Sequence, residues 1–343
     1  MKKEVTIGDR KVGSGHPTYI IAEIGSNHNR DINIAKKLID KAAEAGVDAV
    51  KFQTFKAEKL YSMKTPKFSK DNIKPYDLIK SIELPRSWQK NLCKYSVRKG
   101  LHFLSSPFDY EAVDELDHID VPAFKIASFE IVDLEFLKYV AKKKKPILLS
   151  TGMTNLGEIE DALTTIRSQG NNEIILLHCS SLYPSPVETV NLRAINTMKN
   201  AFQIPVGFSD HTLGIHISLA AIAFGANVVE KHVTLDRTMK GPDHSFAIEP
   251  DEMKQLVREI RDIEKAKGTG IKQRDVREQE MYEKGRRSII AARNIPKGAK
   301  ITRDMLIIKR PGYGIQPKFI DLVIGRRAKV NITAEQWITW DMI

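Results

Sequence analysis

The stretch from Ile204 to His244, IPVGFSDHTLGIHISLAAIAFGANVVEKHVTLDRTMKGPDH, contains the pattern that decides the fold. It predicts a strand at 206–208, an Ala-rich apolar helix at 215–224 that Gly225 can close, and a second strand at 228–229. The two strands of such a strand–helix–strand unit are parallel neighbours, so residues at their carboxyl ends meet at one edge of the sheet.

One histidine follows each of these strands, His211 after the first and His232 after the second. Two imidazoles at adjacent strand ends can bind one divalent cation, with a carboxylate or water completing the coordination. The alternative is that each histidine only hydrogen-bonds the end of its strand, which is the usual role of a single histidine. Their paired placement favours the metal site.

Six further short apolar strands precede this unit, and almost all alternate with helical patterns. Eight strands in this alternation predict an α/β fold, a (β/α)8 TIM barrel. An open doubly wound sheet is the alternative, but the sequence has neither a Gly-rich dinucleotide fingerprint after its first strand nor a Walker sequence. The additional strands are predicted at 19–22, 49–52, 101–105, 123–127, 147–149 and 174–177.

The sequence also predicts the domain boundaries. We assign a barrel domain to residues 1–268, with an N-terminal extension over 1–18 that can form a small hairpin. A charged, Gln-rich linker follows at 269–284, and a small domain occupies 285–343. A polar segment at 56–86 interrupts the barrel pattern and is interpreted as a lid or an oligomer contact.

The small domain contains a short internal repeat. Asn-Ile at 294–295 is followed seven positions later by Ile-Thr, and Asn-Ile at 331–332 is followed by Ile-Thr at the same spacing. Such a repeat is expected of a compact module with pseudo-two-fold symmetry.

Composition limits the class of protein. Hydrophobic residues make up 42% and charged residues 28%, which is typical of a soluble globular chain. The sequence has no apolar run long enough to span a bilayer and no export signal, so we expect neither membrane nor secretion. The two cysteines, Cys93 and Cys179, lack metal-type spacing and fit a reducing cytoplasm.

The formal net charge of +11 does not indicate nucleic-acid binding. The basic residues are dispersed, and zinc-finger, helix-turn-helix and RNP patterns are absent from the sequence. A cationic site for a phosphorylated and carboxylated small molecule explains the positive charge better.

Two lysines lie within predicted strands, Lys51 and Lys125. Helices cover a barrel from outside, so a lysine in the middle of a strand points into the barrel or towards its mouth, and it then needs an anion. Glu23 and Glu130 supply that anion in one interpretation, a purely structural lattice of ion pairs. In the other, a ligand phosphate and carboxylate bind there, supported by nearby serine hydroxyls. These serines are Ser106, Ser128 and Ser150.

Taken together, these residues resemble the sialic acid synthase family, also called N-acetylneuraminate or nonulosonate synthases. The resemblance covers nearly the whole chain, and the motifs follow the family's order. In the tail, RRSIIAARNIPKGAKIT and KRPGYGI resemble the family's antifreeze-like (SAF, β-clip) module. The barrel motifs are AEIGSNHN (22–29), VKFQ (50–53), SSPF (105–108), FKIAS (124–128), LSTGM (149–153), HCSSLYPSP (178–186), GFSDHTLG (207–214), EKHVTLDR (230–237) and GPDH (241–244).

The resemblance implies a transferase that condenses phosphoenolpyruvate with an N-acetylated hexosamine, giving a nine-carbon 2-keto acid and phosphate. It implies that His211 and His232 hold a divalent metal, typically Mn²⁺, with Mg²⁺ or Co²⁺ as alternatives. Glu23, Lys51 and Lys125 are the implied catalytic residues, and both lysines bind phosphoenolpyruvate together with the three serines named above.

The resemblance also implies a domain-swapped homodimer. In it, Arg310 of one protomer reaches the sugar-binding part of the other protomer's barrel. The ASFE stretch at 127–130 resembles pseudaminic acid synthases, whereas GPDH resembles the sialic and legionaminic branch. We therefore rank N-acetylmannosamine first, then the legionaminic and the pseudaminic precursors, which are 2,4-diacetamido-trideoxyhexoses. The sugar-binding residues implied are Gln53, Phe108, Glu130, Ser181, Tyr183, Asp243 and Arg310.

Two other function classes compete with this hypothesis. A Schiff-base aldolase or lyase would use Lys125 or Lys51 as the nucleophile, and it would not need the histidine-bound metal. A non-enzymatic sugar-binding protein would not need Glu23, both lysines and both histidines together.

Overall fold

The computed structural model describes residues 3–68 and 73–343, and its chain divides into two compact units, Met1–Gly268 and Thr269–Ile343. Each unit has its own hydrophobic core.

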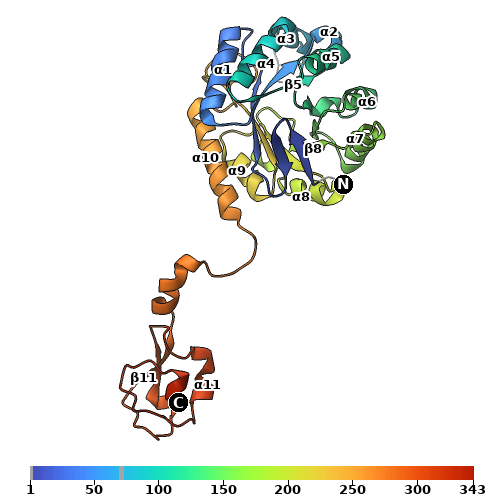
Figure 1. Ribbon diagram of the computed structural model, residues 1–343. Coiled ribbons are helices and arrows are strands. Elements are labelled where there is room, and N and C mark those ends of the chain that lie inside the picture. The colour runs from blue at the N-terminus through green and yellow to red at the C-terminus, as the bar shows by residue number, and fades with distance from the viewer. Residues whose placement is uncertain (1–2, 69–72) are drawn as a thin grey trace. The chain divides into compact units, whose positions relative to one another are not determined.

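The first unit is built on eight parallel strands that form a barrel (Figure 1). The hydrogen-bonded order is β5-β4-β3-β10-β9-β8-β7-β6, and the two end strands, β5 and β6, lie next to each other. This confirms the predicted TIM-barrel fold. The strands are β3 (Tyr19–Gly25), β4 (Ala49–Thr54), β5 (His102–Pro107), β6 (Phe124–Ile126), β7 (Ile147–Ser150), β8 (Ile174–Cys179), β9 (Val206–Asp210) and β10 (Val228–His232).

Eight helices follow the strands and surround them in Figure 1. Their apolar faces pack on the outside of the strands in one continuous core. Local signals fix their ends: Asp31 caps the first helix, and Asn155 and Glu158 form a capping box on α7. The helices are α1 (Ile32–Ala45), α4 (Gln89–Arg98), α5 (Tyr110–His118), α6 (Leu134–Lys142), α7 (Leu156–Ser168), α8 (Arg193–Phe202), α9 (His216–Ala223) and α10 (Pro250–Lys267).

Several strands continue further than their apolar runs predict. The sequence predicted that β3 ends at residue 22 and β10 at residue 229, whereas these strands run through Gly25 and His232. Glu23 and Glu230 therefore lie inside strands, where both are buried. Polar residues continue the strands because their side chains face the interior of the barrel mouth, where they find partners.

The amino-terminal end of the barrel is closed by a hairpin of β1 (Glu4–Ile7) and β2 (Arg10–Gly13). Its apolar residues Val5, Ile7 and Val12 pack in one cluster with the beginnings of the barrel strands. The predicted extension is thus a hairpin over the described residues, with residues 1 and 2 outside them. Access to the barrel is left at its carboxyl-terminal end.

The segment predicted at 56–86 carries two short helices, α2 (Ala57–Leu60) and α3 (Pro75–Ile82), which pack on each other. Residues 69–72 lie outside the described residues. This segment follows β4 and so begins at the open end of the barrel.

The second unit contains the two-stranded sheet β11 (Ser288–Ala291) and β12 (Leu306–Lys309), with α11 at Ile320–Val323. Its internal repeat is visible in the hydrogen bonds. Ile295 and Ile332 exchange backbone bonds of 2.8 and 2.9 Å. Asn294 accepts from the backbone of the second repeat and Asn331 from that of the first, each at 2.8 Å. Equivalent residues make equivalent contacts, as expected of pseudo-two-fold symmetry.

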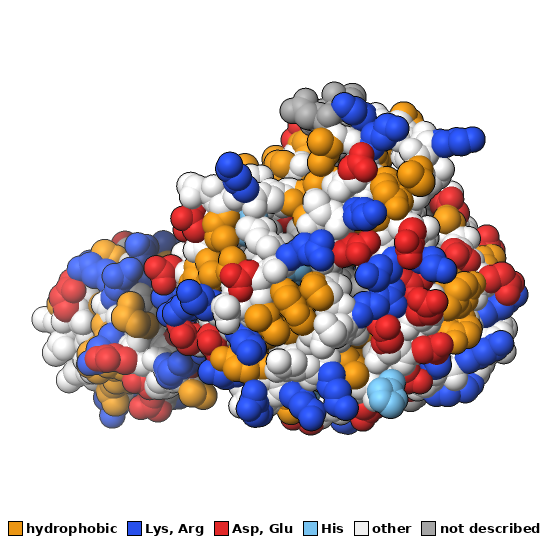
Figure 2. Space-filling model, turned by 90° about the horizontal axis from the view of Figure 1, so that it is seen from above, with side chains coloured by type: hydrophobic (Ala, Val, Ile, Leu, Met, Phe, Trp, Pro, Cys, Tyr) orange, Lys and Arg blue, Asp and Glu red, His pale blue; other side chains and the backbone are white. Residues whose placement is uncertain are grey.

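Charged side chains of both signs are interspersed over the face seen in Figure 2. None of the helices in the described parts of the chain is long and apolar enough to cross a membrane.

Candidate active site

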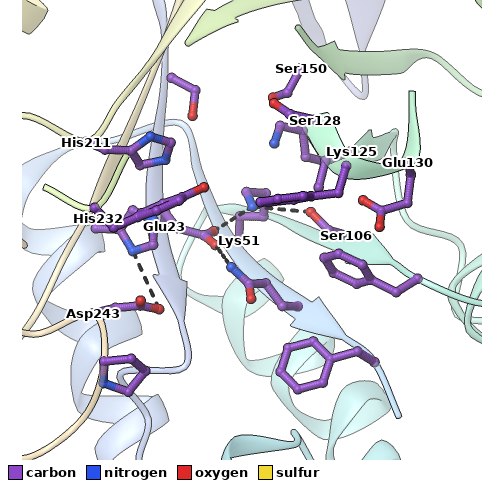
Figure 3. Close-up of a pocket in the computed structure, with 18 of the residues that line it drawn as sticks. Glu23, Lys51, Ser106, Lys125, Ser128, Glu130, Ser150, His211, His232 and Asp243 are labelled. Carbon is purple, nitrogen blue, oxygen red and sulfur yellow. Dashed lines mark hydrogen bonds and ion pairs between the residues drawn. The ribbon is translucent and has the colours of Figure 1, made fainter. Parts of the chain in front are cut away.

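The carboxyl ends of the barrel strands surround a cavity of about 620 Å³. Its lining includes all of the predicted site residues except two. Figure 3 shows the two histidines on one side of the cavity, with the lysines and serines opposite. The predicted residues that line it are Glu23, Lys51, Gln53, Ser106, Phe108, Lys125, Ser128, Glu130, Ser150, Tyr183, His211, His232 and Asp243.

Two buried ion pairs occupy the centre of the site. Lys51 Nζ lies 2.8 Å from Glu23 Oε2, and Lys125 Nζ lies 3.3 Å from Glu230 Oε1. Lys51 also donates to Ser106 Oγ at 3.3 Å (Figure 3). The sequence predicted an anion for each lysine, but it named Glu130 where the structure has Glu230 as the partner of Lys125.

Burial and charge shift the pKa values of this cluster in opposite directions. Burial raises the pKa of Glu23 to about 7, against the opposing effect of the Lys51 ammonium. Burial also lowers the pKa of Lys125, although the Glu230 carboxylate opposes this. Burial works against the Lys51 ammonium as well, yet Glu23 and Glu230 outweigh it and raise its pKa. Lys51 is therefore a stable cation, and Glu23 can exchange a proton near neutral pH.

The two predicted metal ligands lie side by side, with ring centroids 5.4 Å apart and ring planes at 57°. Burial lowers the pKa of His211 to about 4 and that of His232 well below its usual range. Both imidazoles are thus neutral, the state in which a ring nitrogen binds a metal. His211 Nδ1 lies 2.9 Å from the Ser180 carbonyl, to which it donates, so its Nε2 keeps a free lone pair.

The donor set fits a metal ion that is bound by two imidazole nitrogens and whose coordination is completed by oxygen ligands. His232 Nδ1 is buried and lacks a hydrogen-bond partner among the described residues. Asp243 Oδ2 lies 3.9 Å from this nitrogen. Across residues 3–68 and 73–343, no group of three or more His, Cys, Asp or Glu is arranged to hold a metal. Substrate or water oxygens would have to supply the remaining ligands.

The serine side of the cavity contains polar atoms that lack a protein partner. Ser150 Oγ and Glu130 Oε2 are buried without a hydrogen bond within the described parts of the chain. Burial raises the pKa of Glu130 to about 8, so this carboxyl is mostly protonated at neutral pH. Unpaired buried groups of this kind are suited to bind a polar ligand.

An apolar wall faces the polar groups. It comes largely from the interrupting segment, whose helices α2 and α3 thereby take part in the site. We call this set the apolar wall; it consists of Phe55, Leu60, Leu78, Ile79, Ile82 and Phe108.

Two predicted residues remain, one in each unit. Ser181 is not among its lining residues; its hydroxyl lies beside Gly152, where an added Cβ would collide with it. Arg310 belongs to the second unit and is exposed.

The sequence prediction missed Glu230 and Ser209, which line the cavity and hydrogen-bond each other at 2.9 Å. Strand alternation could have found Glu230, since it lies two residues before His232 and so faces the same side. The apolar wall had a weaker signal, because Leu78, Ile79 and Ile82 follow helical spacing but α3 has only eight residues.

The chain is similar to known proteins over most of its length. The NeuB family profile matches residues 38–272, and the SAF domain profile matches residues 286–343. The chain is 45% identical to the N,N'-diacetyllegionaminic acid synthase of Campylobacter jejuni, covering 94% of this chain and 98% of the relative. It is 40% identical to the synthase of that name from Legionella pneumophila, covering 98% and 97%.

The structure of an N-acetylneuraminic acid (sialic acid) synthetase from Leptospira borgpetersenii is similar, with a TM-score of 0.75 and 38% identity. The match covers 82% of this chain and 95% of that one.

Proposed function

Since the chain belongs to the NeuB family and carries a SAF domain, we propose that it condenses phosphoenolpyruvate with an N-acetylated hexosamine. The products are a nine-carbon 2-keto acid and inorganic phosphate. The observation that carries this proposal is the division of one cavity into two halves. Buried lysines and hydroxyls form one half, and two neutral imidazoles form the other.

Phosphoenolpyruvate fits the cationic half. The ammonium groups of Lys51 and Lys125 attract its phosphate and carboxylate, and the hydroxyls of Ser106 and Ser150 donate hydrogen bonds to them. Ser128 lies at the same edge, where its Oγ accepts a hydrogen bond from the Gly152 backbone at 2.9 Å. Binding in this half leaves carbon 3 of phosphoenolpyruvate directed at the opposite half.

The sugar binds as its open-chain aldehyde near the imidazoles. A divalent metal, Mn²⁺ in our proposal, would be held by His211 and His232 and would supply Lewis-acid polarisation of the aldehyde oxygen. Gln53, Tyr183 and Asp243 orient the sugar from the surrounding rim. Asp243 is itself fixed by a 2.8 Å hydrogen bond from Ser26.

The bond changes balance without a redox partner. Carbon 3 of phosphoenolpyruvate attacks the aldehyde carbon, and water adds to the resulting cation at carbon 2. The tetrahedral intermediate then expels phosphate by cleavage of its carbon–oxygen bond. Glu23 stabilises the cation or accepts the proton of the water, a role for which its pKa of about 7 is suited.

The apolar wall bears on the choice of sugar. Each methyl or methylene that it buries contributes about 0.8 kcal/mol of binding. A 2,4-diacetamido-2,4,6-trideoxyhexose has an additional acetamido methyl and a terminal methyl, whereas N-acetylmannosamine presents a hydroxymethyl group. The apolar wall and the sequence identity to two legionaminic acid synthases support our proposal that the legionaminic precursor is preferred over N-acetylmannosamine, which the sequence ranked first.

We also propose a domain-swapped homodimer in which Arg310 acts on the partner's cavity. A cytoplasmic setting fits Cys93 and Cys179, which are both free and buried.

Glu130 is proposed as a sugar ligand because its protonated carboxyl can donate a hydrogen bond.

The test is phosphate release from phosphoenolpyruvate with each of three sugars at matched concentrations: N-acetylmannosamine and the legionaminic and pseudaminic precursors. We expect release only when a sugar is present, and fastest with the legionaminic precursor. If no sugar of the three causes phosphate release, the proposal is overturned. Release with N-acetylmannosamine alone would leave the reaction in place and refute the choice of sugar.

A further inference from the structure

A buried ion pair lies directly behind the two histidines. Lys231 Nζ is 2.9 Å from Asp210 Oδ2, and their side chains are only 2% and 0% exposed. The two residues are register partners on β10 and β9. Neither belongs to the described residues that line the cavity, although their sequence neighbours His211 and His232 do. Because successive side chains of a strand alternate, the pair points away from the cavity while the imidazoles point into it.

The lysine contacts both neighbours of His211. Its ammonium binds the Asp210 carboxylate on one side and the backbone carbonyl of Thr212 on the other. Asp210 also accepts from the Thr212 backbone at 2.8 Å and from Ser218 Oγ at 2.5 Å. The residue that precedes His232 thus holds the turn that carries His211.

We infer that Lys231 and Asp210 are positioning residues that set the separation and orientation of the two imidazoles for a single cation. This inference rests on the proposed function, in which His211 and His232 hold the metal. Metal–imidazole bonds are short and directional, so two ligands on different strands must be held in a fixed relation. A lysine bridging the two ligand-bearing segments provides that relation.

Stability alone is a weak explanation for this pair. A buried ion pair can often be replaced by apolar residues with no loss of stability, because desolvating two charges offsets their attraction. A pair kept for positioning should instead affect metal binding more than folding. The two roles can therefore be separated by measuring both properties on the same variants.

The experiment titrates the full-length protein with Mn²⁺ and follows the free ion by electron paramagnetic resonance. Electron-spin-echo modulation counts the coordinated imidazole nitrogens, and thermal unfolding is measured alongside. The variants are Lys231→Met and Asp210→Asn/Lys231→Met, with His211→Ala as the reference for a lost ligand. Arg261→Met is the matched control. It removes contacts with Thr18 and Glu264 at the amino-terminal end of the barrel.

We expect wild-type protein to bind Mn²⁺ through two imidazoles. The double variant should bind it about 10- to 100-fold more weakly, with at least one imidazole signal lost, while still unfolding cooperatively. Arg261→Met should change the unfolding temperature and leave Mn²⁺ affinity as in wild type. The inference would be overturned if the double variant bound Mn²⁺ with wild-type affinity and kept both imidazole signals. If that variant does not fold, Asp210→Asn alone, which keeps the shape of the side chain, is judged by the same two outcomes.

Failure of the inference and failure of the proposed function give different results. Wild-type protein that binds Mn²⁺ without imidazole signals would refute the positioning role, whatever the sugar assay gives. Two imidazole signals in the wild type and their loss in the variants, without sugar-dependent phosphate release, would support positioning and refute the proposed reaction.

Discussion

Lys51 Nζ and Glu23 Oε2 are 2.8 Å apart across two neighbouring strands, and their side chains are only 3% and 1% exposed. Lys125 and Glu230 repeat this arrangement nearby, so each ammonium already has a carboxylate partner before any ligand binds. An anionic substrate entering this cluster meets negative as well as positive charge. Removing the charge of Glu23 should therefore separate substrate binding from turnover.

Glu23→Gln should lower kcat about 100-fold or more, because a group that handles the water proton or stabilises the cation is lost. The KM for phosphoenolpyruvate should stay the same or fall, since one negative charge leaves the cluster. Steady-state phosphate release measures both parameters. Glu4→Gln, in the hairpin at the other end of the barrel, is the control. A rise in KM with kcat unchanged would contradict the catalytic role of Glu23.

Lys125 should act as a cation and not as a covalent nucleophile. Treatment with pyruvate and borohydride should leave the intact mass unchanged, whereas a Schiff-base enzyme would gain one reduced pyruvyl group. A mass gain that Lys125→Met abolishes would favour the aldolase or lyase alternative. Removing Lys125 takes away the nearer of two ammonium groups beside Glu230, at 3.3 Å, and leaves Lys51 at 3.8 Å. Lys125→Met/Glu230→Gln is therefore the control for the buried carboxylate that loses this partner.

Arg310→Ala should raise the KM for the sugar about 10- to 100-fold, as expected when a charged hydrogen bond is lost. Its KM for phosphoenolpyruvate should change little. Mixing this variant with Glu23→Gln should restore activity once subunit exchange has been verified, because one of the two sites in a mixed dimer then has both residues intact. Verified mixed dimers without recovered activity would refute the swapped arrangement.

Glu130 should make stability depend on pH. Its folded-state pKa of about 8 exceeds the ordinary value of 4.5, so the folded protein favours the protonated carboxyl. The resulting stability is complete below about pH 4.5 and is lost as the pH rises through about 8. Glu130→Gln cannot ionise, so its stability relative to wild type should increase between about pH 4.5 and about pH 8.

Denaturant unfolding across that pH range measures this effect. Glu111→Gln, on an exposed position of α5, is the control for removing a surface carboxyl. A Glu130→Gln difference that is constant with pH would mean that the carboxyl is ionised in the folded protein at neutral pH.

The barrel and most of its site could be predicted because the sequence signals them locally. Apolar runs mark the strand cores, and polar residues at or beyond their ends converge at one face of a parallel barrel. Lys51, Lys125, His211 and His232 were found in this way. Gln53 and Tyr183 also follow strand ends; the family resemblance supplied their sugar-side roles and added Asp243, which no strand end indicates.

What could not be predicted depends on contacts between segments far apart in the sequence. The partner of Lys125 is Glu230 and not Glu130, a choice that is set by which strand faces the lysine across the barrel. The apolar wall depends on where α3 packs in the folded barrel domain, and the helical spacing of Leu78, Ile79 and Ile82 does not indicate that position. Ser181 lies in a matching motif but does not line the cavity.

The most direct test of the central claim uses phosphoenolpyruvate labelled with oxygen-18 in the bridge between carbon 2 and phosphorus. The enzyme is supplied with the legionaminic precursor and Mn²⁺, and both products are analysed by mass spectrometry. We expect a nine-carbon 2-keto acid and inorganic phosphate that carries the label, because the carbon–oxygen bond breaks. Unlabelled phosphate, or phosphate formed without the nine-carbon acid, would contradict it.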